Sequence, residues 1–325
     1  MVPPVAVVVP THNRADRLPR LVRALERQEL RPAEVVFVDD ASTDETPVTL
    51  AELARTTTLA FKFIRLNTPA GPAVARNSGW QSPAVARNRG WRSTSAPLVA
   101  FTDDDCEPTS AWLARAVAVI EPQPRVGIVQ GAVRPDPSAA VGGWPATREV
   151  TSPTPYFEGC NLLLRREALE ESGGFGEAVW RGEDTWLGWA VLRSGWERAF
   201  AADALVYHDV TYPGYRWHLH QSWLIGGVAP LAREFPALRK EFWLPWAFRP
   251  SHPALLSFVA GLVLYRWRRT AVALMLPYLY LRLWPNRTYH PDPTWVRDRL
   301  FITMLDATEV GSTLLQALRT RIFLI

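Results

Sequence analysis

The sequence predicts an α/β fold in which a mostly parallel sheet is flanked by helices. Short apolar runs rich in Val and Phe alternate with helical stretches through the first hundred residues. Such runs indicate strands that are buried on both faces, as in parallel sheets. Polar residues, several of them acidic, follow each run directly. Because open α/β sheets bind ligands beyond the carboxyl ends of their strands, these polar residues are the candidates for chemistry.

The strands and helices are expected to alternate from the N-terminus onward. Strands are expected at residues 5–10, 34–39, 61–66 and 97–102, and helices at residues 17–28 and 46–55 and after Gly71. The polar segments beyond the strands are residues 11–14, 39–44, 67 and 103–105. The carboxyl ends of parallel strands meet at one edge of a sheet, so these segments are expected to form one crevice.

The composition is that of a folded chain with more than one part. Hydrophobic residues make up 48% of the 325 residues and charged residues 21%, which is enough apolar surface for a core. The length exceeds that of a typical domain of roughly 100 to 200 residues. A catalytic domain at residues 1–240 and a helical C-terminal extension at residues 241–325 are therefore expected.

The net charge and the cysteine content indicate which classes of ligand and which cellular compartment to expect. A net charge of +4 and a pI near 9.3 favour anionic ligands such as phosphates or acidic lipids. Nucleic acid is not expected as a partner, because the basic residues are dispersed and no recognised binding motif occurs. The two cysteines, Cys106 and Cys160, and an N-terminus without the pattern of a secretion signal predict a cytoplasmic setting.

One segment of the chain is repeated. Residues 72–77, Pro-Ala-Val-Ala-Arg-Asn, recur 11 residues later as residues 83–88, and each copy is followed by x-Gly-Trp. On one continuous helix the second copy would lie about 16 Å beyond the first, so only one copy can reach a given ligand. A helix that begins where the third strand ends favours Arg76, whereas a restart at Ser82 and Pro83 favours Arg87. We favour Arg76 of the two.

Two apolar stretches lie near the C-terminus, at residues 254–265 and 270–284, and Arg266, Arg268 and Arg269 separate them. Neither reaches the roughly 20 apolar residues of a helix that spans a membrane. Two interpretations stand side by side. The stretches form interfacial helices that lie in the headgroup layer, or they form core helices that close the domain.

Three carboxylates, Asp103, Asp104 and Asp105, directly follow the strand expected at residues 97–102. Clustered carboxylates repel one another, and in an extended segment Asp103 and Asp105 point the same way. Such a pair suits a hard divalent ion, Mg²⁺ or Mn²⁺, that also binds phosphate oxygens. The alternative is a solvated acidic turn.

Two further acidic segments allow a similar choice. Residues 40–43 suit the cap of the next helix, but Asp39 ends a buried strand, where its carboxylate can accept hydrogen bonds from a base or a ribose. Glu183 and Asp184 precede an amphipathic stretch at residues 186–192. Acidic residues at that place are either functional or simply favoured by the helix dipole.

In this order and spacing, these motifs resemble the family 2 glycosyltransferases of the GT-A fold, a Rossmann-like fold, over roughly residues 5–235. The matching segments are Val-Val-Val-Pro-Thr-His-Asn-Arg at 7–14, Val-Asp-Asp-Ala-Ser-Thr-Asp at 38–44, the two Ala-Arg-Asn-x-Gly copies, Phe-Thr-Asp-Asp-Asp at 101–105, Glu-Gly-Cys-Asn at 158–161, Gly-Gly-Phe at 173–175, Glu-Asp at 183–184 and Val-Tyr-His at 206–208.

The resemblance implies a role for each matching residue. The residues it assigns to the nucleotide sugar are Pro10, Thr11, Asn13, Arg14, Asp39, Arg76 or Arg87, Asp103, Asp104 and Asn161. Within that set, Asp39 would face the base. The metal would be bound by Asp103, Asp105 and His208, although a histidine at this place can equally be structural. Asp184 would be the general base, with Glu183 beside it.

The resemblance also implies a reaction. It is the metal-dependent, inverting transfer of one sugar from a nucleotide-diphosphate sugar, most commonly a UDP-sugar, to the hydroxyl of a carbohydrate or glycolipid acceptor. The expected context is cell-envelope synthesis at the inner face of the cytoplasmic membrane. Processive synthesis is not expected, because no Gln-x-x-Arg-Trp motif follows Asp184. Residues 306–321 resemble the tails of actinobacterial-type members of the family.

Three alternatives stay open beside this interpretation. The acceptor could be a polyprenyl phosphate, which the basic, aromatic extension would suit. The chain could instead be a non-catalytic nucleotide-sugar-binding subunit, since fold does not guarantee activity. A nucleotidyltransferase is the nearest alternative of another enzyme class, but residues 11–16, after the first strand, lack the glycine-rich phosphate loop that such enzymes need.

Overall fold

The computed structural model describes residues 2–67, 83–140, 142–179, 181–283 and 295–325. By its internal contacts the chain divides into two compact units, Met1–Tyr212 and Pro213–Ile325. Each unit has its own core and is described separately. This division by contacts does not test the functional boundary expected near residue 240, which stays a prediction.

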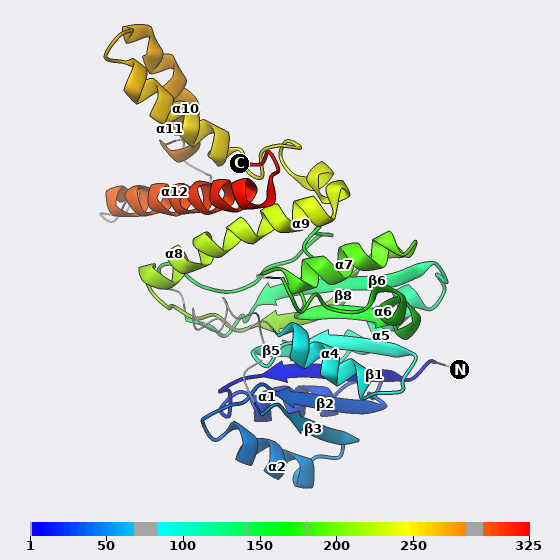
Figure 1. The fold of residues 1–325 in the computed structure, drawn as a ribbon. Coiled ribbons are helices and arrows are strands. Elements are labelled where there is room, and N and C mark those ends of the chain that lie inside the picture. The colour runs from blue at the N-terminus through cyan, green and yellow to red at the C-terminus, as the bar shows by residue number, and fades with distance from the viewer. Residues whose placement is uncertain (1, 68–82, 141, 180, 284–294) are drawn as a thin grey trace. The chain divides into compact units, whose positions relative to one another are not determined.

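The first unit is built on one sheet of eight strands in the order β3-β2-β1-β4-β7-β6-β8-β5 (Figure 1). The strands are β1 (Val5–Thr11), β2 (Glu34–Asp39), β3 (Phe61–Arg65), β4 (Leu98–Thr102), β5 (Cys106–Pro108), β6 (Val126–Pro135), β7 (Asn161–Arg165) and β8 (Glu197–His208). All four strands expected from the apolar runs are present. β1 and β2 are almost completely buried, which explains their continuous apolar sequences.

The sheet is mixed, and its parallel part positions the crevice. β1 pairs in parallel with β2 on one side and with β4 on the other. β3 and the β6–β8 pair are also parallel, whereas β7 and β5 run antiparallel to their neighbours. The chain therefore leaves β1 toward β2 and β3 and returns to its other side at β4. Such a switch point brings the carboxyl ends of three strands together where ligands bind.

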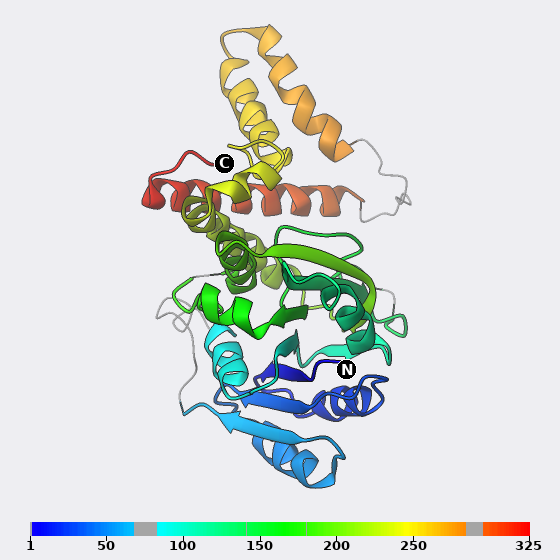
Figure 2. The same cartoon turned by 90° about the vertical axis from the view of Figure 1, so that its right-hand side faces the viewer.

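Helices cover both faces of this sheet (Figure 2). They are α1 (Leu18–Glu26), α2 (Thr46–Thr56), α4 (Ala84–Arg92), α5 (Trp112–Ile120), α6 (Arg166–Ser172) and α7 (Glu183–Arg193). Val7 and Phe37 share one core cluster with apolar residues of α1, α2 and α5. Val36 and Val38, on the opposite face, pack with Ala86 of α4. The alternation of side chains along β2 thus supplies both layers of the core.

The second unit is helical. Its elements are α8 (Tyr215–Leu224), η1 (Ile225–Gly227), α9 (Val228–Glu234), η2 (Pro236–Glu241), α10 (Ser251–Leu264), η3 (Arg269–Met275), α11 (Leu276–Leu283) and α12 (Trp295–Thr320). Ala254 and Leu255 of α10 pack with Tyr278 of α11 and Val310 of α12. None of the helices in the described part of the chain combines the length and the apolar character that a membrane crossing requires.

Candidate active site

The loops that follow β1 and β2 are held together by Asn13. Its backbone adopts a left-handed conformation with φ 53°. Its amide N–H donates to Ser42 Oγ at 2.9 Å, and its side-chain Oδ1 accepts from the Thr43 amide at 2.8 Å. An asparagine tolerates this backbone region better than most residues do. Asn13 therefore fixes the shape of the crevice from the protein side.

Asp39 provides an acceptor in this crevice. Its side chain is fully buried, and Oδ1 accepts the Ser42 amide at 2.9 Å. The nearest cation, Arg65 Nε, lies 3.5 Å from Oδ2, and Oδ2 accepts no hydrogen bond from the described residues. A buried carboxylate oxygen is costly without a donor, so Oδ2 suits a ligand N–H or O–H. Pro10 and Thr11 are buried alongside, and Thr11 pairs in register with Asp39.

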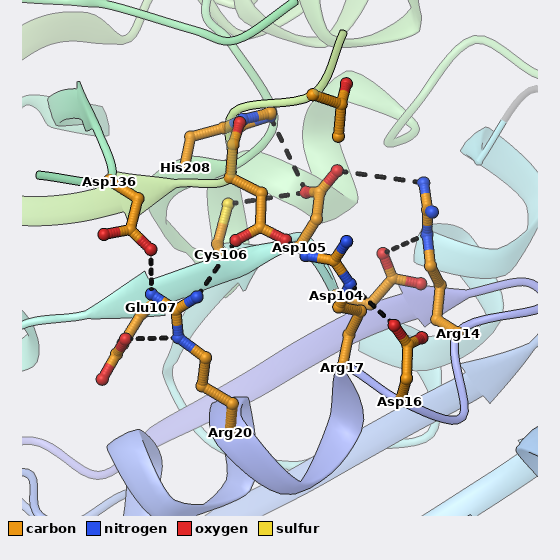
Figure 3. A network of polar contacts seen from close by, with 12 residues as sticks. Arg14, Asp16, Arg17, Arg20, Asp104, Asp105, Cys106, Glu107, Asp136 and His208 are labelled. Carbon is orange, nitrogen blue, oxygen red and sulfur yellow. Dashed lines mark hydrogen bonds and ion pairs between the residues drawn. The ribbon is translucent and has the colours of Figure 1, made fainter. Parts of the chain in front are cut away.

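The acidic loop after β4 leads directly into β5. β5 pairs antiparallel with β8, which places Cys106 opposite His208. Figure 3 shows the Asp105 carboxylate facing both the histidine ring and the cysteine sulfur. Asp105 Oδ1 lies 3.7 Å from His208 Nε2 and 3.9 Å from Cys106 Sγ. Two segments far apart in the sequence thus bring three metal-ligating groups together.

Two of these three groups fit a hard divalent cation. His208 Nδ1 donates to the Asp209 carbonyl oxygen at 2.8 Å, which leaves the Nε2 lone pair directed toward Asp105. The hydrogen bond to Cys160, burial and nearby carboxylates raise the pKa of the Cys106 thiol well above its ordinary value, so the thiol stays protonated. Asp105 and His208 supply an oxygen and an imidazole donor, which suit Mn²⁺ or Mg²⁺, and the part of Asp103 in a metal shell stays a prediction.

Asp104 and Arg14 lie on the other side of the acidic loop (Figure 3). Arg14 Nε lies 3.5 Å from Asp104 Oδ1, and Arg14 Nη2 lies 4.0 Å from Asp105 Oδ2. Burial, followed by the charge of Asp105, raises the pKa of Asp104 to about 7, and Arg14 opposes the shift. Arg14 is partly exposed, so its guanidinium can contact a phosphate as well as these carboxylates.

Arg87 connects the acidic loop to α7. Its side chain is buried, and Nη2 donates to Asp103 Oδ1 at 2.6 Å while Nη1 donates to Glu183 Oε1 at 3.0 Å. The two carboxylates raise the pKa of Arg87 against the effect of burial. A Cβ on Gly159 would lie 3.0 Å from the guanidinium carbon, so this glycine leaves room for the arginine.

Within the described residues, the second repeat copy supplies the arginine that contacts both acidic segments. Pro83 is the N-cap of α4, as the expected restart requires, and Arg87 lies in the first turns of that helix. Arg76, which we favoured from the sequence, lies outside the described residues. The contacts with Asp103 and Glu183 are made by Arg87, which we therefore propose as the arginine of the site, while the preference for Arg76 stays untested.

The rest of the repeat motif explains how α4 is placed. Asn88 Nδ2 donates to the Phe175 carbonyl at 2.9 Å, and Asn88 Oδ1 accepts from the Phe175 amide at 3.0 Å. A Cβ on Gly90 would lie 2.3 Å from Val8 Cγ1, so only glycine lets α4 approach β1 this closely. These contacts orient the helix so that Arg87 faces the site.

Glu183 and Asp184 occupy the first turn of α7, after Gly182 in a left-handed conformation. Glu183 is buried, and burial together with the charge of Asp184 raises its pKa. Asp184 is less buried, and its Oδ2 accepts the Gly159 amide at 3.1 Å. Of the two carboxylates, Asp184 is therefore the more exposed.

Asn161 serves the core of the sheet rather than the crevice. Its Oδ1 accepts from Trp112 Nε1 at 2.7 Å, and its Nδ2 donates to the carbonyls of Ala132 at 2.7 Å and Ala204 at 2.8 Å. Both amide donors and the oxygen are thus used inside the protein. We therefore do not assign Asn161 the ligand contact that the resemblance implied.

A charged network that was not predicted from the sequence lies beside the candidate metal site. Arg20, on α1, binds Glu107 at 2.5 Å, Asp136 at 2.5 Å and Asp209 at 3.1 Å (Figure 3). Arg17 also pairs with Asp209. These partners flank β5 and the ends of β6 and β8, so the arginines hold the strands that carry Asp105 and His208. No local pattern could identify partners up to 189 residues away.

A family model described as glycosyl transferase family 2 matches residues 6–82 and 80–175. The two matched ranges meet between the two repeat copies and together cover more than half of the chain. The chain belongs to glycosyl transferase family 2, as its motifs predict.

Curated relatives agree with this assignment. The chain is 28% identical over 246 residues to the pre-mycofactocin glycosyltransferase of Mycobacterium tuberculosis, a match that covers 71% of this chain and 48% of the relative. It therefore spans about half the length of that relative. Glycosyltransferase AglE of Haloferax volcanii is 26% identical over 276 residues, which cover 78% of this chain and 84% of AglE.

Solved structures confirm the GT-A-type fold. Mannosyltransferase PcManGT from Pyrobaculum calidifontis, in complex with GDP-Man and Mn²⁺, is similar with a TM-score of 0.65 and 22% identity, over 95% of this chain and 88% of that one. Residues 1–349 of S. aureus TarS, in complex with UDP-GlcNAc, are similar with a TM-score of 0.51 and 18% identity, over 98% and 92%.

Proposed function

We propose that this chain catalyses the metal-dependent, inverting transfer of one sugar from a nucleotide-diphosphate sugar to an acceptor hydroxyl. The observation that carries the proposal is the double contact of Arg87. One buried guanidinium binds Asp103 on the donor side and Glu183, next to Asp184, on the acceptor side. A single residue thus unites the metal-binding loop and the candidate base in one site.

The donor's nucleoside would lie beyond β1 and β2, where Asp39 Oδ2, which accepts no hydrogen bond from the described residues, would accept one from the base. Arg14 would contact the diphosphate from the edge of the crevice. PcManGT with GDP-Man and TarS with UDP-GlcNAc support a nucleotide-sugar donor in this fold. We propose a UDP-sugar, the donor that the family resemblance suggests first.

Asp103, Asp105 and His208 would hold Mn²⁺ or Mg²⁺. The Mn²⁺ of PcManGT and the closeness of the Asp105 and His208 donor atoms support this assignment, and Asp103 follows from the family resemblance. Such a cation, when bound, neutralises the negative charge of a diphosphate leaving group. Arg87 reduces the repulsion between the carboxylates of this loop, because its positive charge lies against Asp103. The Asp105 carboxylate is left available for the cation.

Asp184 would accept the proton of the acceptor hydroxyl as that oxygen attacks the anomeric carbon. An alcohol is too weak an acid to attack efficiently unaided, so a positioned carboxylate is required. The Gly159 amide fixes Asp184, while Glu183 is engaged with Arg87. A single displacement by this route inverts the anomeric centre, and NMR of the first-formed product would show retention if the proposal were wrong.

The acceptor is proposed to be a carbohydrate or a glycolipid in cell-envelope synthesis, with a polyprenyl phosphate as the alternative. We place the reaction at the inner face of a membrane. The free, buried thiols of Cys106 and Cys160 support a reducing compartment. The exposed apolar residues of α10 and α11 support contact with a membrane.

Purified protein would be incubated with Mn²⁺ or Mg²⁺ and a panel of nucleotide sugars, and the release of nucleoside diphosphate would be measured. We expect metal-dependent release that Asp105→Ala and Asp184→Ala abolish and that Asp203→Ala, at an exposed position on β8, leaves unchanged. Nucleotide binding without release, even with candidate acceptors added, would favour a non-catalytic subunit. A ladder of products would contradict single-sugar transfer.

A further inference from the structure

The helices α10 and α11, with the residues that join them, form an apolar arm at residues 251–283. Gly261 lets the arm pack closely, because a Cβ there would lie 2.7 Å from Met275 Cγ. Large apolar side chains remain exposed along both halves of the arm. They are Leu256, Val259, Leu262, Val263, Leu264, Tyr265, Trp267, Val272, Leu274, Leu276, Tyr280, Leu281 and Leu283.

All the charged side chains of the arm are positive. Residues 251–283 contain four arginines and no Asp, Glu or Lys. Arg282 is paired with Asp306 of α12, but among the described residues neither Arg266 nor Arg268 has an ion-pair partner. These two, with Arg269, follow the end of α10 directly and are exposed, as are their neighbours. The arm thus combines an apolar surface with uncompensated positive charge.

Aromatic side chains lie at the same turn. Trp267 is 70% exposed, and the Arg269 guanidinium lies 4.7 Å from the centre of the Tyr265 ring. Trp and Tyr prefer the headgroup region of a bilayer, and arginine there extends its charge toward the phosphates. The turn therefore has the composition of a segment that lies at a membrane interface.

The other end of the arm is anchored within its own unit. Asp306 of α12 accepts from Tyr278 Oη at 2.7 Å and from Arg282 Nε at 2.7 Å. Glu309 of α12 accepts from Arg249 Nη1 at 2.8 Å, just before α10 begins. These buried polar contacts fix the base of the arm and leave its turn free to contact a partner.

We propose that the arm docks the protein on an anionic membrane surface, with Arg266, Arg268 and Arg269 among the lipid phosphates and the apolar side chains in the outer hydrocarbon layer. α10 has 14 residues and is about 21 Å long, less than the roughly 30 Å of a hydrocarbon core, so the arm lies in the interface. A second copy of the arm is a poorer partner, because it brings the same positive charge and no carboxylate. The inference rests on the membrane location proposed above and not on the transfer chemistry.

The test is flotation with vesicles of phosphatidylcholine alone or mixed with an equal amount of phosphatidylglycerol, without any sugar nucleotide. We expect binding to the anionic vesicles that weakens as salt rises. The triple variant R266Q/R268Q/R269Q should bind about 100-fold more weakly, since each arginine near such a surface contributes about fivefold. The matched control R216Q/R233Q/K240Q removes three exposed charges of the same unit outside the arm and should bind as the wild type does.

Trp267→Ala tests the apolar part separately and should weaken binding at every salt concentration. Absence of binding to anionic vesicles, or equal loss in the two triple variants, would overturn the proposal. A stable dimer that Trp267→Ala converts to a monomer, without vesicle binding, would assign the arm to self-association instead. Because no donor is present, each outcome is independent of whether the protein transfers a sugar.

Discussion

Arg87 Nη2 lies 2.6 Å from Asp103 Oδ1, and the other terminal nitrogen of the same buried guanidinium binds Glu183. A planar guanidinium can hold two carboxylates on two elements at once, which an ammonium group on a lysine cannot do with the same geometry. The alignment of α4, the acidic loop and α7 therefore depends on this one side chain.

Replacing Arg87 should affect both stability and activity. Arg87→Ala leaves Glu183 buried without its cation, which we expect to cost about 3 kcal/mol of unfolding free energy. Arg87→Lys should recover part of the stability but little of the activity. Urea unfolding and donor turnover would be measured on both variants and on Arg76→Ala. A greater loss of activity from Arg76→Ala than from Arg87→Lys would contradict the choice of the second copy.

Asp39→Asn should weaken the binding of the nucleoside diphosphate by about tenfold or more, because a hydrogen bond to a charged acceptor contributes about 1.5 to 3 kcal/mol. Isothermal titration calorimetry with the free nucleotide measures this without any acceptor. Asp203→Asn, an exposed carboxylate in the same unit, is the control. Unchanged affinity in Asp39→Asn would place the base elsewhere.

The metal site allows a matched pair of substitutions on facing residues of β5 and β8. His208→Ala removes a ligand and should weaken Mn²⁺ affinity by at least about tenfold, since even the loss of an outer-shell partner costs that much. Cys106→Ser should leave the affinity unchanged, because Mn²⁺ prefers oxygen and imidazole ligands to a soft sulfur ligand. Electron paramagnetic resonance of free Mn²⁺ would measure both. A loss confined to Cys106→Ser would reverse the assignment.

Glu158 should make the fold less stable as pH rises. Burial raises the pKa of its carboxyl group above the ordinary value of 4.5, although Thr154 donates a hydrogen bond to it. From about pH 4.5 upward the unfolded chain releases this proton while the folded protein keeps it, so the group's contribution falls until the raised pKa is passed. Denaturant unfolding across this range should show a smaller fall for Glu158→Gln. Equal pH dependence in the two proteins would exclude the raised pKa.

The elements of the fold could be predicted because their signals are local. β2 spans the expected residues 34–39, and β1 extends the expected 5–10 by Thr11 alone. A short apolar run followed by polar residues predicts a buried segment, and a central strand is such a segment. The mixed character of the sheet was not visible, because the direction of β7 depends on pairing with distant strands.

The site could be predicted only where its residues lie close together in the sequence, within one motif. Asp105 and His208 are close in space because β5 pairs with β8, a fact that no local pattern contains. Asn161 resembled a ligand contact, yet its amide is required to satisfy Trp112 and two backbone carbonyls. Likewise, the contacts of Arg87 with Asp103 and Glu183 depend on the packing of α4, where Gly90 lies against β1, and only a folded chain reveals that packing.

The most direct test of the central claim is anomalous diffraction from crystals grown with Mn²⁺ and a nucleoside diphosphate. We predict one Mn²⁺ peak bound by Asp105 Oδ and His208 Nε2, with the diphosphate on the same ion and the base within hydrogen-bonding distance of Asp39 Oδ2. A metal peak remote from Asp105 and His208, or a nucleotide bound away from the ends of β1 and β2, would contradict the account.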